Sequence, residues 1–226
     1  MALTEHYLTK FEEGNFYHIY NRSIDRKPMF KNERNYEFFL KKYYAYLSPV
    51  IDTYSYCLLG NHFHLLVSVK ERLQTINLTT SKKLSNLKIA DKEKTTHDIV
   101  SHQFRKFFQS YAMAFNTQQN RTGTLFQTPF KRALVTEQQY LTRLIYYIHS
   151  NPQLHNLTDN FRNWRWSSYN SILNDKPDKL KKKDVIEWFG NKDLFNQFHD
   201  QMQKVKIDRK YYLEDDDNDV NSKHIY

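Results

Sequence analysis

The chain has 226 residues, of which 39% are hydrophobic and 26% are charged, a composition that supports one folded core with an appendage and excludes wholesale disorder. With only 4 glycines it contains no glycine-rich phosphate loop, neither the dinucleotide-binding type nor the P-loop type, which excludes those cofactor folds. Its 34 Lys and Arg against 25 Asp and Glu give a net charge of +9, which is typical of proteins that bind nucleic acid. Charge alone indicates only non-specific association with such a partner.

The single cysteine, Cys57, excludes an internal disulfide and is typical of a reducing compartment. No apolar run is long enough to span a membrane, and the first residues lack the hydrophobic region of a signal peptide. We therefore expect a cytoplasmic protein without a membrane partner.

In the first half of the chain, alternation of apolar and polar residues predicts a strand over 15–22. Helical spacing of apolar residues predicts a helix over 33–47. Two strand-like runs follow at 51–59 and 62–69, and Gly60-Asn61 between them is typical of a hairpin turn. A polar stretch over 70–98 without periodicity indicates an insertion.

In the second half, a continuous apolar stripe predicts a helix over 100–115, and an extended segment is expected over 125–135. Thr136 and Gln139 have the spacing of a capping box, which would open a third long helix that Pro152 closes. The order of elements predicts an α+β fold, a ferredoxin-like or RRM-like antiparallel sheet with helices on one face. We expect one domain over 1–175 and a helical C-terminal extension with an acidic tail over 176–226.

Two histidines of the second hairpin strand, His62 and His64, are two residues apart. Side chains at this spacing point to the same face of a strand, so both imidazoles can reach one metal ion while Phe63 packs on the other side. The same pattern is also compatible with two ordinary histidines in a half-buried strand.

Tyr147 and Asn151 are one helical turn apart at the edge of the apolar stripe of the third helix, whereas Tyr146 points about a third of a turn away. An amide offers an oxygen ligand, and a tyrosine hydroxyl offers a nucleophile that can form a covalent intermediate. A tyrosine at a core boundary and an asparagine near a helix end are equally ordinary structural features.

Taken together, these motifs resemble the single-tyrosine HUH transposases, in particular the branch associated with repetitive extragenic palindromes (REPs). Six segments occur in the order of that family and cover most of the first 170 residues. They are YHIYNR (17–22), YCLLGNHFHLL (56–66), YAMAFN (111–116), GTLFQ (123–127), YYIHSNP (146–152) and WRWSSY (164–169). The insertion over 70–98 and the extension after 175 have no counterpart in the compact pattern of the family.

The resemblance implies that His62, His64 and Asn151 bind Mg²⁺ or Mn²⁺ and that Tyr147 is the nucleophile. It implies cleavage and strand transfer of single-stranded or hairpin DNA through a 5′-phosphotyrosine intermediate, as in DNA transposition or the mobilisation of REP-type elements. The resemblance does not decide whether the protein is a monomer or a homodimer.

Basic residues in or beside the matching segments are the candidates for contacts with the DNA backbone, because phosphate contacts dominate affinity. They are Arg22, Arg121, Lys131 and Arg132. Trp166 can stack on an unpaired base or simply pack against the extension. The alternative function is a non-catalytic nucleic-acid-binding protein on an RRM-like sheet, although the chain lacks the aromatic motif of RNA-binding sheets.

Overall fold

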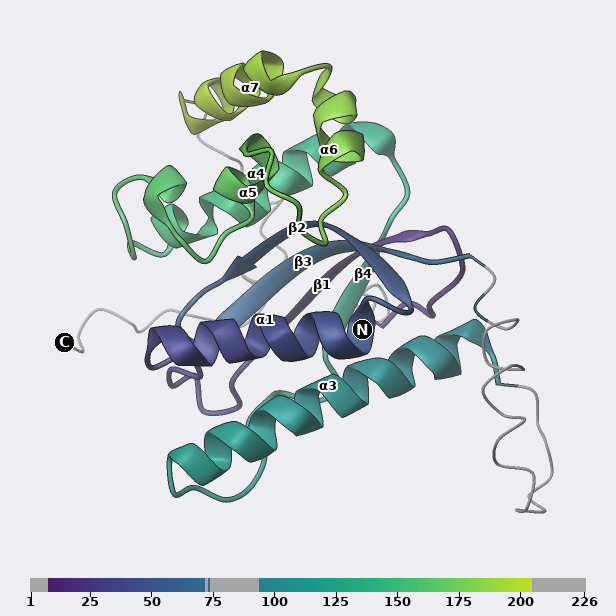
Figure 1. Ribbon diagram of the computed structural model, residues 1–226, viewed down its shortest axis with the longest axis vertical. Helices are drawn as coiled ribbons and strands as arrows, with labels where there is room; N and C mark the ends of the chain where they lie inside the picture. The colour runs from purple at the N-terminus through teal and green to yellow at the C-terminus, as the bar shows by residue number, and fades with distance from the viewer. Residues whose placement is uncertain (1–7, 72, 74–93, 205–226) are drawn as a thin grey trace, which may run out of the picture.

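A four-stranded antiparallel sheet lies at the centre of the computed structural model, which describes residues 8–71, 73 and 94–204 (Figure 1). The strands lie side by side in the order β2-β3-β1-β4. Their bounds are β1 (Phe16–Arg22), β2 (Ile51–Leu58), β3 (His62–Val69) and β4 (Lys131–Val135). The predicted α+β class with an antiparallel sheet is confirmed.

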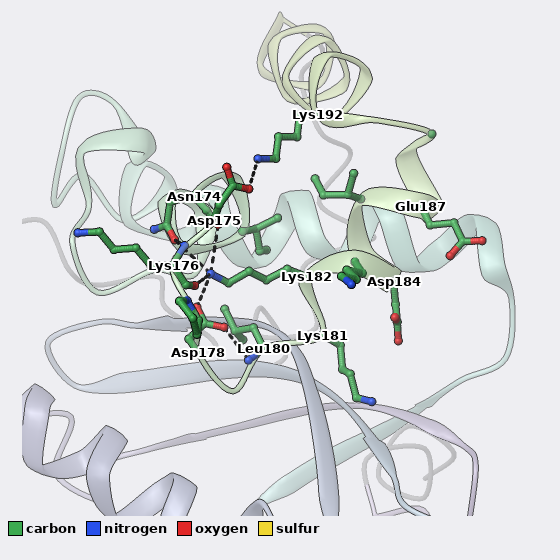
Figure 2. Close-up of a pocket in the computed structure, with 15 residues that line it drawn as sticks. Asn174, Asp175, Lys176, Asp178, Leu180, Lys181, Lys182, Asp184, Glu187 and Lys192 are labelled. Carbon is green, nitrogen blue, oxygen red and sulfur yellow. Dashed lines mark hydrogen bonds and ion pairs between the residues drawn. The ribbon is translucent and has the colours of Figure 1, made fainter.

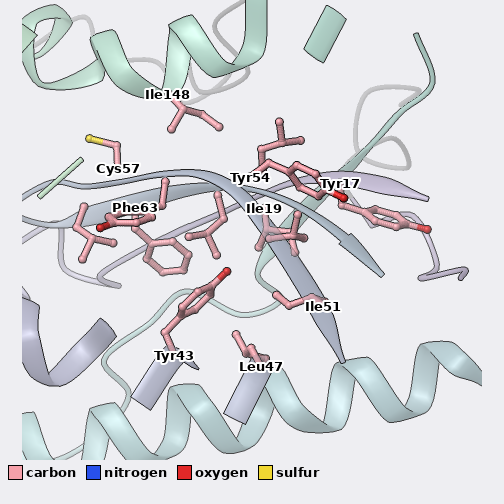
Figure 3. Packing of buried hydrophobic residues seen from close by; sticks show 14 of the residues in the cluster. Tyr17, Ile19, Tyr43, Leu47, Ile51, Tyr54, Cys57, Phe63 and Ile148 are labelled. Carbon is pink, nitrogen blue, oxygen red and sulfur yellow. The ribbon is translucent and has the colours of Figure 1, made fainter. Parts of the chain in front are cut away.

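Helices α1 (Glu33–Leu47) and α3 (Thr96–Gln118) cover one face of this sheet (Figure 1). Aromatic side chains at helical spacing fill the layer between them and the strands. The ring of Phe39 on α1 lies 4.9 Å from that of Phe107 on α3 and 5.2 Å from that of Phe63 on β3. Tyr43 and Leu47 point into the same layer (Figure 3). Burial of these large rings makes this layer the main hydrophobic core.

Helix α4 (Gln138–Leu154) crosses the opposite face of the sheet, so the helices occupy both faces rather than the one face expected (Figure 1). The physical reason lies in the strands, because every residue of β3 is buried and each face therefore needs a cover. Ile148 of α4 packs toward the strands from this side (Figure 3). In the described part of the chain, α4 therefore covers the face that RRM-like proteins leave open for RNA.

Both ends of α4 differ from the prediction. The N-cap residue is Glu137, one residue after the expected Thr136, and the Glu137 side chain makes no capping hydrogen bond. Pro152 lies within the last turn, and the helix continues to Leu154. A proline in a final turn removes only one backbone donor, and the helix tolerates that loss here. Asn151 therefore remains helical, one turn after Tyr147.

The extended segment expected over 125–135 is only partly a strand, because β4 is confined to its last five residues. The first part makes a single bridge, between Phe126 and Ser23, and is otherwise irregular. The insertion expected over 70–98 lies mostly outside the described residues, and its last three residues form the first turn of α3.

The C-terminal segment consists of short helices on the α4 side of the sheet (Figure 1). They are η2 (Phe161–Asn163), α5 (Tyr169–Leu173), α6 (Lys182–Phe189) and α7 (Lys192–Lys204). One of them, α6, reaches the strands, because the ring of Trp188 stacks on Tyr54 of β2 at 4.9 Å and meets Phe16 of β1 at 5.5 Å. The backbone N–H groups of Ser168 and Lys181 donate to Tyr56 O and Thr53 O, which ties the segment to β2. The acidic tail lies outside the described residues.

Within the described ranges, no helix combines the length and apolar character needed to cross a membrane.

Candidate active site

Three histidines lie together on the face of the sheet that α4 covers. His62 and His64 come from β3, and their ring centroids are 5.4 Å apart. His18 comes from the neighbouring strand β1, and its Nε2 lies 3.0 Å from His64 Nδ1. All three are buried. Phe63, between the two β3 histidines in sequence, points to the opposite face and packs on Phe39.

Tyr147 of α4 contacts two of these histidines, His64 and His18. Its ring meets that of His64 edge to face at 5.6 Å and that of His18 at 6.0 Å. The side chain is buried, at 5% exposure. The helix thus brings a tyrosine from late in the chain against one histidine of the second hairpin strand and one of β1.

The amide of Asn151 is held in a defined orientation one turn along the same helix. Asn151 Nδ2 donates to the backbone carbonyl of Tyr147 at 2.9 Å. Its Oδ1 is buried and, among the residues that the structure describes, accepts no hydrogen bond. A buried carbonyl oxygen without a donor is costly, which is the situation expected for an atom that binds a ligand.

Tyr146 points to the other side of α4, as the helical spacing predicts. Its ring contacts Phe161 at 6.0 Å and His199 of α7 at 5.5 Å. It is therefore part of the packing between α4 and the C-terminal helices and does not face the histidine site.

Sequence reasoning missed three residues at this site, His18, Asn61 and His155. Asn61 Oδ1 lies 2.6 Å from His62 Nδ1, and the ring of His155 meets that of His62 at 4.8 Å. The alternation in 15–22 does place His18 on one face of its strand, but its partner depends on which strand pairs with it. Nothing in the local sequence identifies His155, which follows the last turn of α4.

Two of the proposed DNA-contacting residues lie on the same face as the histidines. Arg22 is the register partner of His62 across β1 and β3. The Nζ atom of Lys131 lies over the ring of Tyr20 at 5.7 Å, and that ring is in turn stacked on His64 at 5.7 Å. These two positive charges therefore flank the site along the sheet.

The other proposed DNA-contacting residues have structural partners. The Arg132 guanidinium points to the opposite face, where it donates to Thr9 O at 2.6 Å and Leu8 O at 3.2 Å. Burial lowers the pKa of Arg132 from its usual value. Arg121 donates to Thr124 O within its own turn. Arg132 thus serves the fold in this structure, whereas the DNA contact expected for Arg121 stays a prediction.

Trp166 lies between two neighbours rather than open to solvent. Its ring is stacked on Tyr36 at 4.4 Å, and the Arg165 guanidinium lies over it at 4.9 Å. A base could stack on this ring only by displacing Arg165.

The side chains that could bind a metal ion beside the histidines are of more than one chemical type. In the described part of the chain, no three His, Cys, Asp or Glu side chains are grouped to hold a metal ion. The third protein donor beside His62 and His64 would instead be the amide oxygen of Asn151, a ligand type that suits hard divalent cations.

A separate cavity of about 750 Å³ lies between the 174–181 loop and helices α6 and α7 (Figure 2). Two pairs of its charged side chains form ion pairs with one another. Lys182 contacts Asp178 and Lys192 contacts Asp175, both at 2.7 Å. The histidines and Tyr147 do not line it, so this cavity is distinct from the site described above.

The fold and the buried histidine-tyrosine cluster define an α+β protein with a candidate metal and nucleophile site. Comparison with solved structures finds similarity to a REP-associated tyrosine transposase bound to a REP hairpin, with a TM-score of 0.55. The aligned region covers 74% of this chain and 84% of that chain, at 12% sequence identity. At this identity the similarity establishes a shared fold. Comparison with protein-family models and with curated proteins finds no match.

Proposed function

We propose that the protein is a metal-dependent DNA single-strand endonuclease and strand-transfer enzyme with Tyr147 as its nucleophile. The observation that carries the proposal is the contact of the Tyr147 ring with His64 and His18, with the Asn151 amide one turn away. The fold shared with a transposase bound to a REP hairpin supports single-stranded or hairpin DNA as the substrate, and transposition or REP-type mobilisation as the process.

The residues present fit a divalent cation. His62 and His64 offer imidazole nitrogens from one face of β3, and Asn151 offers the buried Oδ1 for which the described residues provide no donor. Mg²⁺ or Mn²⁺ held there would act as a Lewis acid on the scissile phosphate and help to orient it.

Tyr147 carries the covalent step. Its hydroxyl oxygen attacks phosphorus and loses its proton to solvent, so a tyrosyl–phosphate bond forms as the bond between phosphorus and the 3′ oxygen breaks. The 3′ oxygen takes up a proton from solvent and leaves as a 3′-OH. The 3′-OH of another strand then attacks the same phosphorus and loses its proton to solvent, so a new bond to the 3′ oxygen forms as the tyrosyl–phosphate bond breaks. The Tyr147 oxygen takes up a proton, and the number of phosphodiester bonds is conserved.

Arg22 and Lys131 would hold the DNA backbone at this site, because they lie on the face of the sheet that carries the histidines. Neutralisation of phosphates by such side chains releases counterions and supplies most of the affinity for DNA.

The test is covalent capture of a labelled hairpin oligonucleotide with a single-stranded flank. With Mn²⁺, the wild-type protein should give a cleaved product and an adduct that survives SDS electrophoresis. Tyr147→Phe should give neither, while it still shifts the oligonucleotide on a native gel, because only one oxygen is removed. Tyr146→Phe is the matched control and should retain both products, since Tyr146 packs against Phe161 and His199.

Two results would overturn the proposal. One is an adduct that persists in Tyr147→Phe and maps by mass spectrometry to another tyrosine. The other is binding of the hairpin by the wild-type protein without any adduct, which would favour a non-catalytic nucleic-acid-binding protein.

A further inference from the structure

The imidazole of His62 is oriented by the residue that precedes it. Its Nδ1 lies 2.6 Å from Asn61 Oδ1. The Asn61 amide is itself fixed, because its Nδ2 donates to the carbonyl of Arg26 at 2.7 Å. The oxygen of the amide therefore faces His62, and since an amide oxygen can only accept, Nδ1 must carry the proton of the neutral ring.

The imidazole of His64 is oriented in the same way by a different residue. Its Nδ1 lies 3.0 Å from His18 Nε2, and the two rings are stacked with centroids 5.3 Å apart. Both side chains are completely buried. One of the two nitrogens must donate to the other, and donation by His64 leaves the lone pair of His64 on Nε2.

The same nitrogen of each β3 histidine, Nδ1, is thus engaged by a neighbour. A neutral imidazole binds a metal through the nitrogen without a proton, and the hydrogen bond made by the other nitrogen decides which one that is. We propose that Asn61 and His18 are positioning residues that hold His62 and His64 in the Nδ1–H tautomer, so that both rings present Nε2 to the metal. This inference rests on the metal-dependent function proposed above.

The first test measures the tautomers directly in the metal-free protein. Long-range ¹H–¹⁵N spectra distinguish a protonated from an unprotonated ring nitrogen in each neutral histidine. His62 and His64 should both show a protonated Nδ1 and an unprotonated Nε2. An Nε2–H tautomer at either residue would overturn the inference, whatever the activity of the enzyme.

The second test measures Mn²⁺ affinity by the EPR signal of the free ion. His18→Phe keeps a flat ring beside Tyr20 and His64 but removes the acceptor for His64 Nδ1. Loss of such a partner lowers metal affinity about 10–100-fold. His102→Phe is the control, because His102 lies on α3 against Arg105 and should leave Mn²⁺ affinity unchanged.

Two substitutions of Asn61 test its hydrogen bond with His62 in the same way. Asn61→Leu removes the oxygen that accepts from His62 and should weaken Mn²⁺ binding within the same range. Asn61→Asp retains an oxygen acceptor and should restore the affinity. Circular dichroism and thermal unfolding of each variant would show that the fold persists.

The outcomes separate this inference from the proposed function. Mn²⁺ affinity that is unchanged in His18→Phe and Asn61→Leu would overturn the inference alone, provided that the wild-type protein binds Mn²⁺ and forms the DNA adduct. A wild-type protein that binds no Mn²⁺ would overturn both the proposed metal site and the positioning of its ligands.

Discussion

The rings of Tyr147 and His64 meet edge to face, with centroids 5.6 Å apart and planes at 82°. One side chain comes from helix α4 and the other from strand β3, so the relationship depends on how the helix packs on the sheet. Both side chains are buried, and buried rings in close contact do not move independently. A shift of α4 along β3 would therefore alter the proposed nucleophile and metal ligands together.

The first prediction concerns the histidine ligands. His62→Ala or His64→Ala should reduce cleavage of a single-stranded oligonucleotide by more than about 100-fold, because each removes one member of a small donor set. EDTA should abolish cleavage by the wild-type protein. The measurement is the initial rate with Mn²⁺ or Mg²⁺, accompanied by circular dichroism to show that the variants are folded. Undiminished cleavage in EDTA would contradict the metal site.

The second prediction compares two adjacent basic residues that point to opposite faces of β4. Lys131→Gln should weaken DNA binding and reduce the slope of log affinity against log salt by about 0.7, the effect of one phosphate contact on a single strand. Its melting temperature should change little, because Lys131 is only partly buried.

Arg132→Gln should lower the stability of the fold and leave DNA binding largely unchanged. The Arg132 guanidinium donates to Thr9 O and Leu8 O, and loss of such charge-assisted bonds costs about 2 kcal/mol of stability. Binding isotherms at several salt concentrations and urea unfolding would separate the two effects. Equal losses of DNA affinity in both variants would contradict the assignment of Arg132 to the fold.

The third prediction concerns the form of the substrate. The protein should cleave single-stranded or hairpin DNA in preference to a fully paired duplex, because in-line attack by Tyr147 needs an exposed backbone. Affinity should fall steeply with salt as counterions are released. Equal cleavage rates on a perfectly paired duplex of the same sequence would contradict this substrate class.

Much of the fold follows from local patterns. The helix predicted over 33–47 has those bounds in the structure, because its apolar spacing is regular and the Asn32 side chain accepts a hydrogen bond from Asn35 N–H at its start. The hairpin around Gly60-Asn61 also forms as predicted, and period-two spacing alone accounts for His62 and His64 sharing a face.

The remainder depends on tertiary contacts that local patterns do not contain. His18 meets His64 only because β1 pairs with β3 in a register that puts Tyr20 opposite His64. Arg132 lies in the interior because the segment at Leu8 and Thr9 packs beside β4 and supplies carbonyl acceptors. The second covered face could not be predicted from element order, which does not specify the side of the sheet on which α4 lies.

The fourth prediction concerns pH and the contact between α4 and α7. His199 is buried, donates from Nδ1 to Phe195 O at 2.8 Å, and places Nε2 3.1 Å from His149 Nδ1. Burial, with a smaller contribution from the positive charge of Arg162, lowers the pKa of His199 to about 3. Burial also lowers the pKa of His149, with a further contribution from His199. Both rings are therefore neutral in the folded protein at neutral pH.

An unfolded chain protonates His199 near its usual pKa of about 6.5. The contribution of this residue to stability is therefore fully present above pH 6.5 and is lost as the pH falls toward 3, by about 1.4 kcal/mol per pH unit. Urea unfolding between pH 8 and pH 4 should show this loss in the wild-type protein. His199→Phe should be less stable at pH 8, because His149 Nδ1 loses its acceptor, but its stability should depend less on pH. Parallel pH profiles for the two proteins would show that a buried neutral His199 does not control the acid sensitivity of the fold.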